Sequence, residues 1–299
     1  MPDSPFVSVV VPVYNDPEGV KDTLHALVDQ RDAPGFEVRV VDNDSTDETM
    51  QVIEAFAADH PEIYCHTETE IQSSYAARNT GIEHAGGDVI VFLDADVVVE
   101  RTCLRDISRT FEGSDVDYVG CNVQMYNPGE TDTFWTKYDL AMGLPVEHYL
   151  RRKRFAPTCA LAVRREVIEA VGTFDDELVS GGDKEFGNRV SEAGFRMGFA
   201  EGIVAKHPAR TSLKRNIQKS TRIGKGQVQL WAGYGLAAHP VSYTRYLPPD
   251  PRRVRNRRDA QFDLVSIYLA EILLKYVQSA TVLYLYLKRL LKRVSGDTT

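Results

Sequence analysis

The stretch Asp88–Glu100, which reads DVIVFLDADVVVE, decides how the chain folds. Four apolar residues, Ile90 to Leu93, run directly into two carboxylates, Asp94 and Asp96, with a single alanine between them. Other pairs of acids with this spacing occur in the chain, so the spacing alone says little. The apolar run before the acids is what distinguishes this pair. It predicts a buried strand over 88–93 that ends in acidic side chains.

The pattern on either side of this stretch predicts an α/β fold. Short β-branched runs alternate with amphipathic segments, and this alternation is typical of a mostly parallel sheet with helices on both faces. The predicted strands before 88–93 are Phe6–Val13, Glu37–Val41 and Ile63–His66, and the predicted helices are near 17–30, 45–58 and 73–85. The capping-box pattern Ser45-Thr-Asp-Glu48 predicts that the second helix starts directly after Asp44.

Two acidic side chains follow predicted strands of this sheet. Asp42 comes after the second strand and Asp94 after the fourth. Ligands of open parallel sheets bind beyond the carboxyl ends of the strands, so both residues are candidates for a site. A cation or hydrogen-bond donors must compensate carboxylates at such positions.

The chain carries neither of the glycine-rich nucleotide loops. The first strand runs into Pro12-Val-Tyr-Asn-Asp16, with no G-x-G-x-x-G, and Gly224-Lys-Gly226 is followed by Gln227 and so is no phosphate loop. A bound diphosphate must then be neutralised in another way. A divalent metal held by Asp94 or Asp96 would do this.

Composition limits the class of protein. The chain has 299 residues and 43% hydrophobic content, which suits one large domain or one domain with an appendage. Its net charge is −8, yet residues 250–299 hold ten Lys or Arg against five Asp or Glu. An acidic body with a basic end argues against nucleic-acid binding and for a local contact with an anionic partner.

The cysteines and the start of the chain bear on location. The four cysteines lie far apart without a C-x-x-C pair, so neither a zinc site nor a disulfide framework is expected. The first residues, MPDSPFVSVVVPVYN, lack the basic region of a signal peptide. We therefore expect a cytoplasmic protein, located at the cytoplasmic face of the membrane if its C-terminal part binds lipid.

Four segments, in this order and spacing, resemble the inverting family-two nucleotide-sugar glycosyltransferases with the GT-A fold. They are VSVVVPVYN, VVDNDSTDET, AARNTGIEHAGGDVIVFLDAD and GGDKEFGNRVSEAGF, and the resemblance covers roughly residues 6–225. It implies a Rossmann-like GT-A domain, with a helical C-terminal appendage here, and a nucleoside-diphosphate sugar as donor.

The resemblance also implies roles for residues that bind the donor. Pro12 and Tyr14 are expected to line the base pocket, and Asp42 to accept a hydrogen bond from the base. Arg78 is expected to reach the nucleotide or its phosphates, and Asp94 the ribose or the donor sugar. Two simpler alternatives stay open: Asp42 could cap a helix near Ser45, and Arg78 could only pair with a surface acid.

The metal and the base follow from the same resemblance. Asp96 is expected to ligate Mn²⁺ or Mg²⁺, and His207, after a strand-like segment over Met197–Ala205, to complete the metal shell. Asp183 matches the general base. The alternatives are a structural His207, an Asp183 that caps a helix over 184–194, and Glu185 as the base.

Two departures from the family pattern concern the base and the donor sugar. The usual Glu-Asp pair before the base is Gly182-Asp183 here, so a partner carboxylate is missing. Ala160 stands where relatives often carry Asn, which leaves the identity of the sugar open.

A basic segment follows the predicted metal ligands. Seven Lys or Arg and no acid occur from Lys206 to Lys225. Lys219, Arg222 and Lys225 recur at a spacing of three, near one helical face. We expect these residues to contact the donor diphosphate, Arg222 above all, or an acceptor phosphate. The alternative is a solvated face.

The C-terminal part reads as an appendage. We divide the chain into a catalytic domain over 1–238, a Pro/Arg-rich linker over 239–259 and an amphipathic helical region over 260–299. Ten apolar residues of the last region follow a three-four spacing: Phe262, Val265, Leu269, Ile272, Tyr276, Ala280, Leu283, Leu287, Leu290 and Val294. Charged residues interrupt the run, so a bilayer span is not expected.

Three partners would suit this amphipathic region. The basic residues at both of its ends fit peripheral contact with an anionic membrane, in which case a polyprenyl-phosphate-linked acceptor becomes attractive. The other two partners are the catalytic domain and a second copy of the chain, which would make a homodimer.

The sequence therefore predicts a metal-dependent inverting glycosyltransferase. It would transfer a sugar from a nucleoside-diphosphate sugar, a UDP-sugar, to a glycan or lipid-linked acceptor. The alternatives are a polyprenyl-phosphate sugar synthase, which would transfer to the lipid phosphate itself, and a non-catalytic nucleotide-sugar-binding scaffold.

Overall fold

The computed structural model describes residues 7–129, 132–252 and 263–295. The chain divides into two compact units. The first consists of Met1–Gln124, Leu144–Glu177 and Gly182–Pro208, and the second of Met125–Gly143, Leu178–Gly181 and Ala209–Thr299. The predicted domain boundary at residue 238 stays a prediction.

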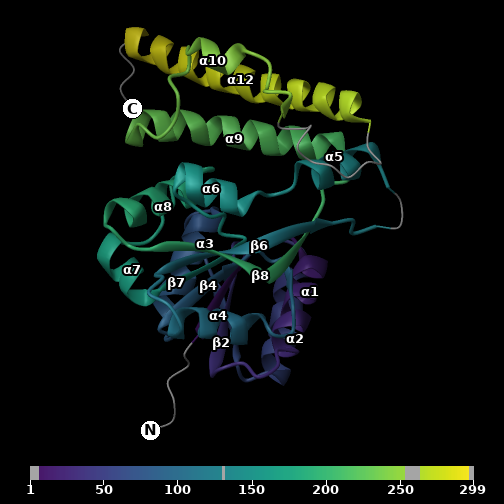
Figure 1. Cartoon of the computed structure of the whole chain (residues 1–299), viewed down its shortest axis with the longest axis vertical. Coiled ribbons are helices and arrows are strands. Elements are labelled where there is room, and N and C mark those ends of the chain that lie inside the picture. The colour runs from purple at the N-terminus through teal and green to yellow at the C-terminus, as the bar shows by residue number, and fades with distance from the viewer. Residues whose placement is uncertain (1–6, 130–131, 253–262, 296–299) are drawn as a thin grey trace. The chain divides into compact units, whose positions relative to one another are not determined.

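One sheet forms the first unit (Figure 1). Within the described residues it has eight strands in the order β3-β2-β1-β4-β7-β6-β8-β5. The strands are β1 (Val7–Val13), β2 (Phe36–Asp42), β3 (Ile63–Thr67), β4 (Val89–Leu93), β5 (Val98–Val99), β6 (Tyr118–Tyr126), β7 (Ala160–Arg164) and β8 (Met197–Pro208).

The sheet is mixed. β1 pairs in parallel with β2 and β4, and β2 with β3. β7 pairs antiparallel with β4 and β6, and β5 pairs antiparallel with β8. The predicted α/β class with a mostly parallel sheet is confirmed, and the antiparallel strands are an addition that the alternation pattern did not predict.

The central strands explain why the apolar runs fold as they do. Every residue of β1 and β4 is buried. A strand that is covered on both faces reads as a continuous hydrophobic run instead of an alternating one, as the stretch before Asp94 does.

Helices connect and cover the strands of this unit. They are α1 (Pro17–Val28), α2 (Thr49–Asp59), α3 (Ser74–His84), α4 (Cys103–Glu112), α6 (Val146–Lys153), α7 (Arg165–Val171) and α8 (Gly182–Glu192). The predicted capping box is wrong. α2 begins at Thr49, and the Ser45 hydroxyl accepts the N–H of Asn15 at 2.9 Å instead of capping a helix. A tertiary contact therefore takes the place of the local one.

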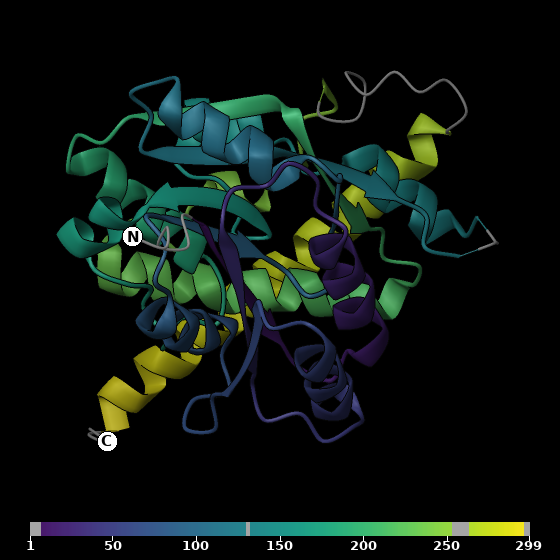
Figure 2. The same cartoon turned by 90° about the horizontal axis from the view of Figure 1, so that it is seen from below.

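The second unit is helical. It contains α5 (Phe134–Met142), α9 (Leu213–Tyr234), the short α10 (Tyr243–Tyr246) and α12 (Leu264–Ser295). α12 packs against α9, shown in yellow and green (Figure 2). Gly224 permits this contact, because a Cβ there would lie 2.9 Å from the Gln278 carbonyl oxygen. Tyr138, Ile267, Ala270 and Leu274 form a core cluster.

The predicted linker and tail are partly visible. α10 lies within the linker. Residues 253–259 of the linker, and 260–262 and 296–299 of the tail, lie outside the described residues. No helix in the described ranges is long and apolar enough to cross a membrane. The apolar stripe singled out from the sequence is largely not the face that packs on α9. The buried residues of α12 are Ile267, Ala270, Leu274, Ser279 and Val282, whereas Val265, Leu269 and Leu287 are exposed.

Candidate active site

The carboxyl ends of three neighbouring strands meet at one edge of the sheet. The β1–β2 register places Val13 beside Asp42, and the β1–β4 register places Val10 beside Phe92. Asp42 and the turn that begins at Asp94 therefore lie at the same edge, on either side of the end of β1. This is the edge at which ligands of such sheets bind.

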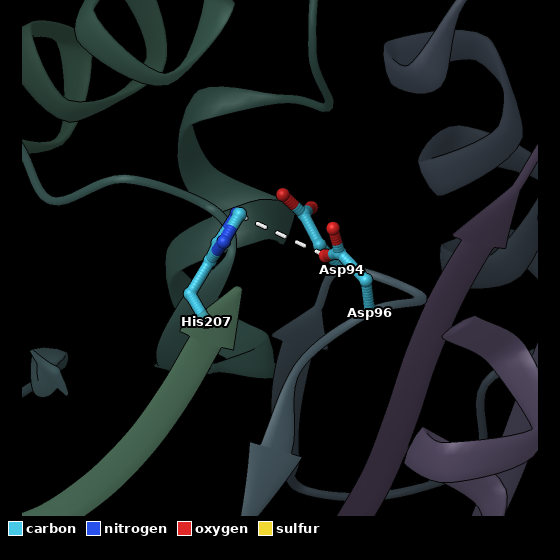
Figure 3. Close-up of side chains that lie close together, drawn as sticks. All are labelled: Asp94, Asp96 and His207. Atoms are coloured by element: carbon cyan, nitrogen blue, oxygen red, sulfur yellow. Dashed lines mark ion pairs between the residues drawn. The ribbon is translucent and has the colours of Figure 1, made fainter. Parts of the chain in front are cut away.

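Strand pairing also explains how His207 reaches the turn that carries Asp96. β5 follows this turn and pairs antiparallel with β8, with Val98 beside Lys206. The same register places His207 next to the start of β5. One ligand atom from each of Asp94, Asp96 and His207 lies within 4.8 Å of the others, and Nε2 of His207 is 3.8 Å from Oδ1 of Asp96 (Figure 3).

The tautomer of His207 suits a metal ligand. Its Nδ1 lies 3.0 Å from the carbonyl oxygen of Pro208. Because a carbonyl only accepts, Nδ1–H is the donor, and the other ring nitrogen, Nε2, is left with a lone pair facing Asp96 when the ring is neutral. A backbone carbonyl that fixes the ring in this way is the usual support of a metal-bound histidine.

The three side chains bring the carboxylates of Asp94 and Asp96 close to the ring of His207. Burial raises the pKa of the Asp96 carboxyl, the negative charges of Asp94 and Asp16 raise it further, and His207 lowers it. Carboxylates are ligands that suit Mn²⁺ or Mg²⁺, and a neutral imidazole as the third ligand favours the transition metal, Mn²⁺, over Mg²⁺. The residues present therefore fit the predicted metal.

Arg78 holds one of these carboxylates in place. Its Nη2 donates to Oδ1 of Asp94 at 2.5 Å, and its Nη1 donates to the Ser74 carbonyl at 3.1 Å. The Arg78 side chain is only 4% exposed. Arg78 therefore pairs with an acid, as the simpler alternative expected, but that acid belongs to the candidate metal cluster. A contact of Arg78 with the donor stays a prediction.

The two carboxylate oxygens of Asp42 differ, because only one of them accepts a hydrogen bond among the described residues. Its Oδ2 accepts the N–H of Ser45 at 3.0 Å. Asp42 therefore caps a turn near Ser45 and not a helix, because α2 begins only at Thr49. Its Oδ1 is buried and has no hydrogen-bond partner among the described residues. The neighbouring Pro12 is buried at the end of β1, and Tyr14 is half exposed. An unpaired buried acceptor beside an exposed aromatic ring suits a ligand that donates a hydrogen bond.

Asp183 lies in the first turn of α8, which begins at Gly182, so it is not the residue before the helix. The N–H of Gly182 donates to the Tyr75 hydroxyl at 2.9 Å. A Cβ at Gly182 would lie 2.8 Å from the Tyr75 ring, so only glycine fits this contact. Tyr75 is on α3, one turn before Arg78, and thus links the start of α8 to the helix that holds Asp94.

Glu185 is not available as the base. It is 3% exposed, and its two oxygens accept from Nε and Nη2 of Arg189 at 2.6 and 2.8 Å. A buried carboxylate bound at both oxygens by one guanidinium has a structural role. Asp183 is partly exposed, and its role as the general base stays a prediction.

Cys159 and Tyr75 were missed by the sequence reasoning. The Cys159 carbonyl accepts the Asp94 N–H at 3.3 Å. Burial, followed by the negative charge of Asp94, raises the pKa of the Cys159 thiol well above its ordinary value, so it stays protonated. The sequence could not predict that the backbone at Cys159 contacts Asp94, because a lone cysteine in an apolar run has no distinctive spacing.

The predicted basic group lies in the second unit. Arg222 and Lys225 are exposed on α9, and the contact of Arg222 with the donor stays a prediction. Lys219 is 3.7 Å from the buried carboxylate of Asp139, which also accepts from Nη1 of Arg210 at 3.1 Å. The sequence pattern did not single out Asp139. Its carboxylate pairs with Arg210 and Lys219, two residues of the basic segment.

Comparison with known proteins assigns this fold and site to a class, the glycosyltransferases that use a nucleotide sugar. The profile of the family described as Glycosyl transferase family 2 matches residues 8–172. The chain is 38% identical to the glycosyltransferase AglE of Haloferax volcanii over 228 residues, which are 76% of this chain and 74% of AglE. The chain belongs to glycosyl transferase family 2.

Solved structures show the same fold at low identity. The mannosyltransferase PcManGT from Pyrobaculum calidifontis, in complex with GDP-Man and Mn²⁺, superposes with a TM-score of 0.63 at 19% identity, covering 99% of this chain and 89% of PcManGT. TarS 1–349 from S. aureus, in complex with UDP-GlcNAc, gives 0.56 at 17% identity, covering 97% of this chain and 92% of that one.

Proposed function

We propose that this protein is a metal-dependent inverting glycosyltransferase whose donor is a UDP-linked sugar and whose acceptor is a hydroxyl group of a glycan or of a lipid-linked saccharide. The observation that carries the proposal is the meeting of His207 with Asp94 and Asp96, more than a hundred positions earlier in the chain, with one ligand atom of each within 4.8 Å of the others. The Mn²⁺ and GDP-Man of PcManGT and the UDP-GlcNAc of TarS support the donor class.

Each residue of the site has a physical role in this proposal. Asp96 and His207 would hold Mn²⁺ or Mg²⁺, which would supply positive charge to the departing diphosphate. Asp94, which the resemblance assigns to the ribose or the donor sugar, lies close enough to these two residues to serve as a third ligand. The Arg78 guanidinium keeps Asp94 in its ligating position, and Arg222 adds a positive charge toward the phosphates. Asp42 accepts a hydrogen bond from the base with its unpaired Oδ1, and Pro12 and Tyr14 line the base pocket.

Asp183 serves as the general base. An incoming hydroxyl must lose its proton as it attacks the anomeric carbon, and a carboxylate positioned beside it accepts that proton. The contact of Gly182 with Tyr75 fixes the backbone next to this carboxylate. Attack on the face opposite the leaving diphosphate inverts the anomeric centre.

A panel of nucleotide sugars tests the proposal. UDP-, GDP- and dTDP-sugars are incubated with the full chain and Mn²⁺, Mg²⁺ or a chelator, with and without glycan and lipid-linked acceptors, and release of nucleoside diphosphate is measured. We expect metal-dependent release with at least one UDP-sugar, which an acceptor stimulates. Donor binding without any metal-dependent release would instead favour a non-catalytic nucleotide-sugar-binding scaffold.

A further inference from the structure

The outward side of α12 carries a continuous apolar stripe. Its residues are spaced by four, four and three along the helix, and each is exposed. They are Val265, Leu269, Leu273, Tyr276, Ala280, Tyr284, Leu287 and Leu291. Val265 is 68% exposed at one end and Leu291 is 69% exposed at the other. Water therefore reaches apolar side chains over almost the whole length of the helix.

The other side of α12 is already occupied. Ile267, Leu274 and Val282 are at most 5% exposed, on the side of the helix that packs within the second unit. A helix with one partner normally has one apolar face and one polar face. An apolar stripe opposite the packed face therefore indicates a second partner.

The apolar surface continues onto the segment around α10. This segment is fixed to α12, because the Tyr276 hydroxyl donates to the Tyr246 carbonyl at 3.1 Å and the Ser279 hydroxyl donates to the Arg245 carbonyl at 3.2 Å. The exposed apolar residues of the segment are Val241, Tyr243 and Leu247, and Tyr243 is 76% exposed. The combined surface is wider than one stripe.

The spacing and width favour a flat partner over a second helix. Steps of four, four and three repeat every eleven residues, about 3.7 residues per turn, so the stripe stays on one side of a nearly straight helix. A left-handed coiled coil would need a seam with the shorter heptad period of about 3.5. Residues beside the stripe, on α10, would also lie outside the narrow seam of a coiled coil.

The charge of the helix favours an anionic partner. Lys288, Arg289 and Lys292 are exposed, and no acid occurs from Tyr276 to Lys292. Lys288 and Lys292 each follow a stripe residue and lie about 100° around the helix from it. Their long side chains can bury the aliphatic part along the apolar surface while the ammonium group reaches anionic groups. Tyrosines such as Tyr276 and Tyr284 suit the boundary between apolar and aqueous phases.

We propose that the apolar stripe of α12, together with Val241, Tyr243 and Leu247, lies on the surface of an anionic lipid bilayer, with Lys288, Arg289 and Lys292 at the level of the lipid phosphates. The inference goes beyond the proposed function, because binding to lipid requires no donor, metal or acceptor. It would place a glycosyltransferase beside lipid-linked acceptors.

Vesicle flotation of the full chain tests this. The vesicles contain either phosphatidylcholine alone or phosphatidylcholine with about one third phosphatidylglycerol, at low and high salt. We expect the protein to float with the anionic vesicles and to be released by salt. The triple variant Leu269→Ser/Tyr284→Ser/Leu287→Ser should lose flotation, and each charge removed in Lys288→Gln and Lys292→Gln should weaken partitioning roughly fivefold.

Matched controls keep the result interpretable. Ile71→Ser removes an exposed apolar side chain of the first unit, and Lys21→Gln an exposed cation, and both variants should float like the wild type. Circular dichroism should show the same helix content for the triple variant, because its three side chains are exposed. Equal flotation of wild type and triple variant would overturn the inference, as would equal binding to both kinds of vesicle. Dimerisation that depends on the stripe, without vesicle binding, would assign the stripe to a second copy of the chain.

Discussion

Nη2 of Arg78 lies 2.5 Å from Oδ1 of Asp94, and the Arg78 side chain is almost fully buried while the carboxylate is one-third exposed. The guanidinium comes from α3 and the carboxylate from the turn after β4, so this pair joins a helix to the candidate metal site. It leaves Oδ2 of Asp94 for another partner. We infer that Arg78 orients Asp94, in addition to any contact with the donor.

Replacement of Arg78 by methionine is expected to weaken Mn²⁺ binding and nucleoside diphosphate release by roughly 10–100-fold, the usual effect of losing a residue that supports a metal ligand. Isothermal titration with Mn²⁺ measures the binding. Arg101→Met is the control, because Arg101 forms an exposed pair with Asp29. Unchanged Mn²⁺ affinity in Arg78→Met would remove the positioning role.

The unpaired Oδ1 of Asp42 leads to a prediction about the base. Asp42→Asn replaces the carboxylate by an amide, and a hydrogen bond to a charged group is worth about 1.5–3 kcal/mol. We expect roughly tenfold to hundredfold weaker binding of UDP, measured by calorimetry. Asp44→Asn, at an exposed position two residues on, should bind UDP like the wild type. The assignment fails if both variants retain full affinity.

Asp183→Asn tests the base. The variant should turn over about 10²–10⁴-fold more slowly while its affinity for the donor stays near that of the wild type. Steady-state rates and donor titrations separate the two quantities. Glu185→Gln is a useful comparison, because it disrupts the pair with Arg189 and should lower the melting temperature. Turnover of Asp183→Asn close to the wild type would favour a phosphate acceptor, which hardly needs a base, and hence a polyprenyl-phosphate sugar synthase.

Lys219 gives the second unit a pH-dependent stability. Burial, and next the charge of Arg210, lower the pKa of Lys219 to about 8 from an ordinary value of 10.5. Between these two values the unfolded chain keeps the proton and the folded chain releases it. The contribution of Lys219 to the free energy of unfolding therefore rises as the pH increases through this range.

Urea denaturation of wild type and Lys219→Met at about pH 7.5 and about pH 10 measures this contribution. The free energy of unfolding of the wild type, minus that of the variant, should be larger at the higher pH. Burial raises the pKa of Tyr118 and Cys121, which act in the opposite direction, but they are present in both proteins and cancel in the difference. A difference that stays constant, or that matches the exposed control Lys214→Met, would contradict the prediction.

The sequence predicted the parallel half of the sheet well. The strands β1 and β4 are continuous apolar runs, and such runs have few alternatives to a buried strand. The acidic ends of β2 and β4 could be placed at one edge because parallel strands share a direction. The Ser45–Glu48 pattern failed because the Ser45 hydroxyl pairs with the N–H of Asn15, which is thirty residues away in the chain.

The remaining features depend on contacts between distant segments. The position of His207 follows from the β5–β8 register, and β5 has only two residues, too few to give a periodic signal. The contact of Tyr75 with Gly182 and the pairing of Asp139 with Lys219 join residues more than seventy positions apart. Local pattern cannot show such pairs. The periodicity of α12 was visible, but not which of its sides packs on α9.

The central claim is that Asp94, Asp96 and His207 form a divalent-cation site on which the donor depends. Calorimetric titration of a UDP-sugar into wild type and Asp96→Asn, each with Mn²⁺ and then with a chelator, tests it most directly. We expect chelation to weaken donor binding to the wild type at least about tenfold, which corresponds to roughly 1.4 kcal/mol, and to have little further effect on the variant. Equal donor affinity in all four measurements would contradict it.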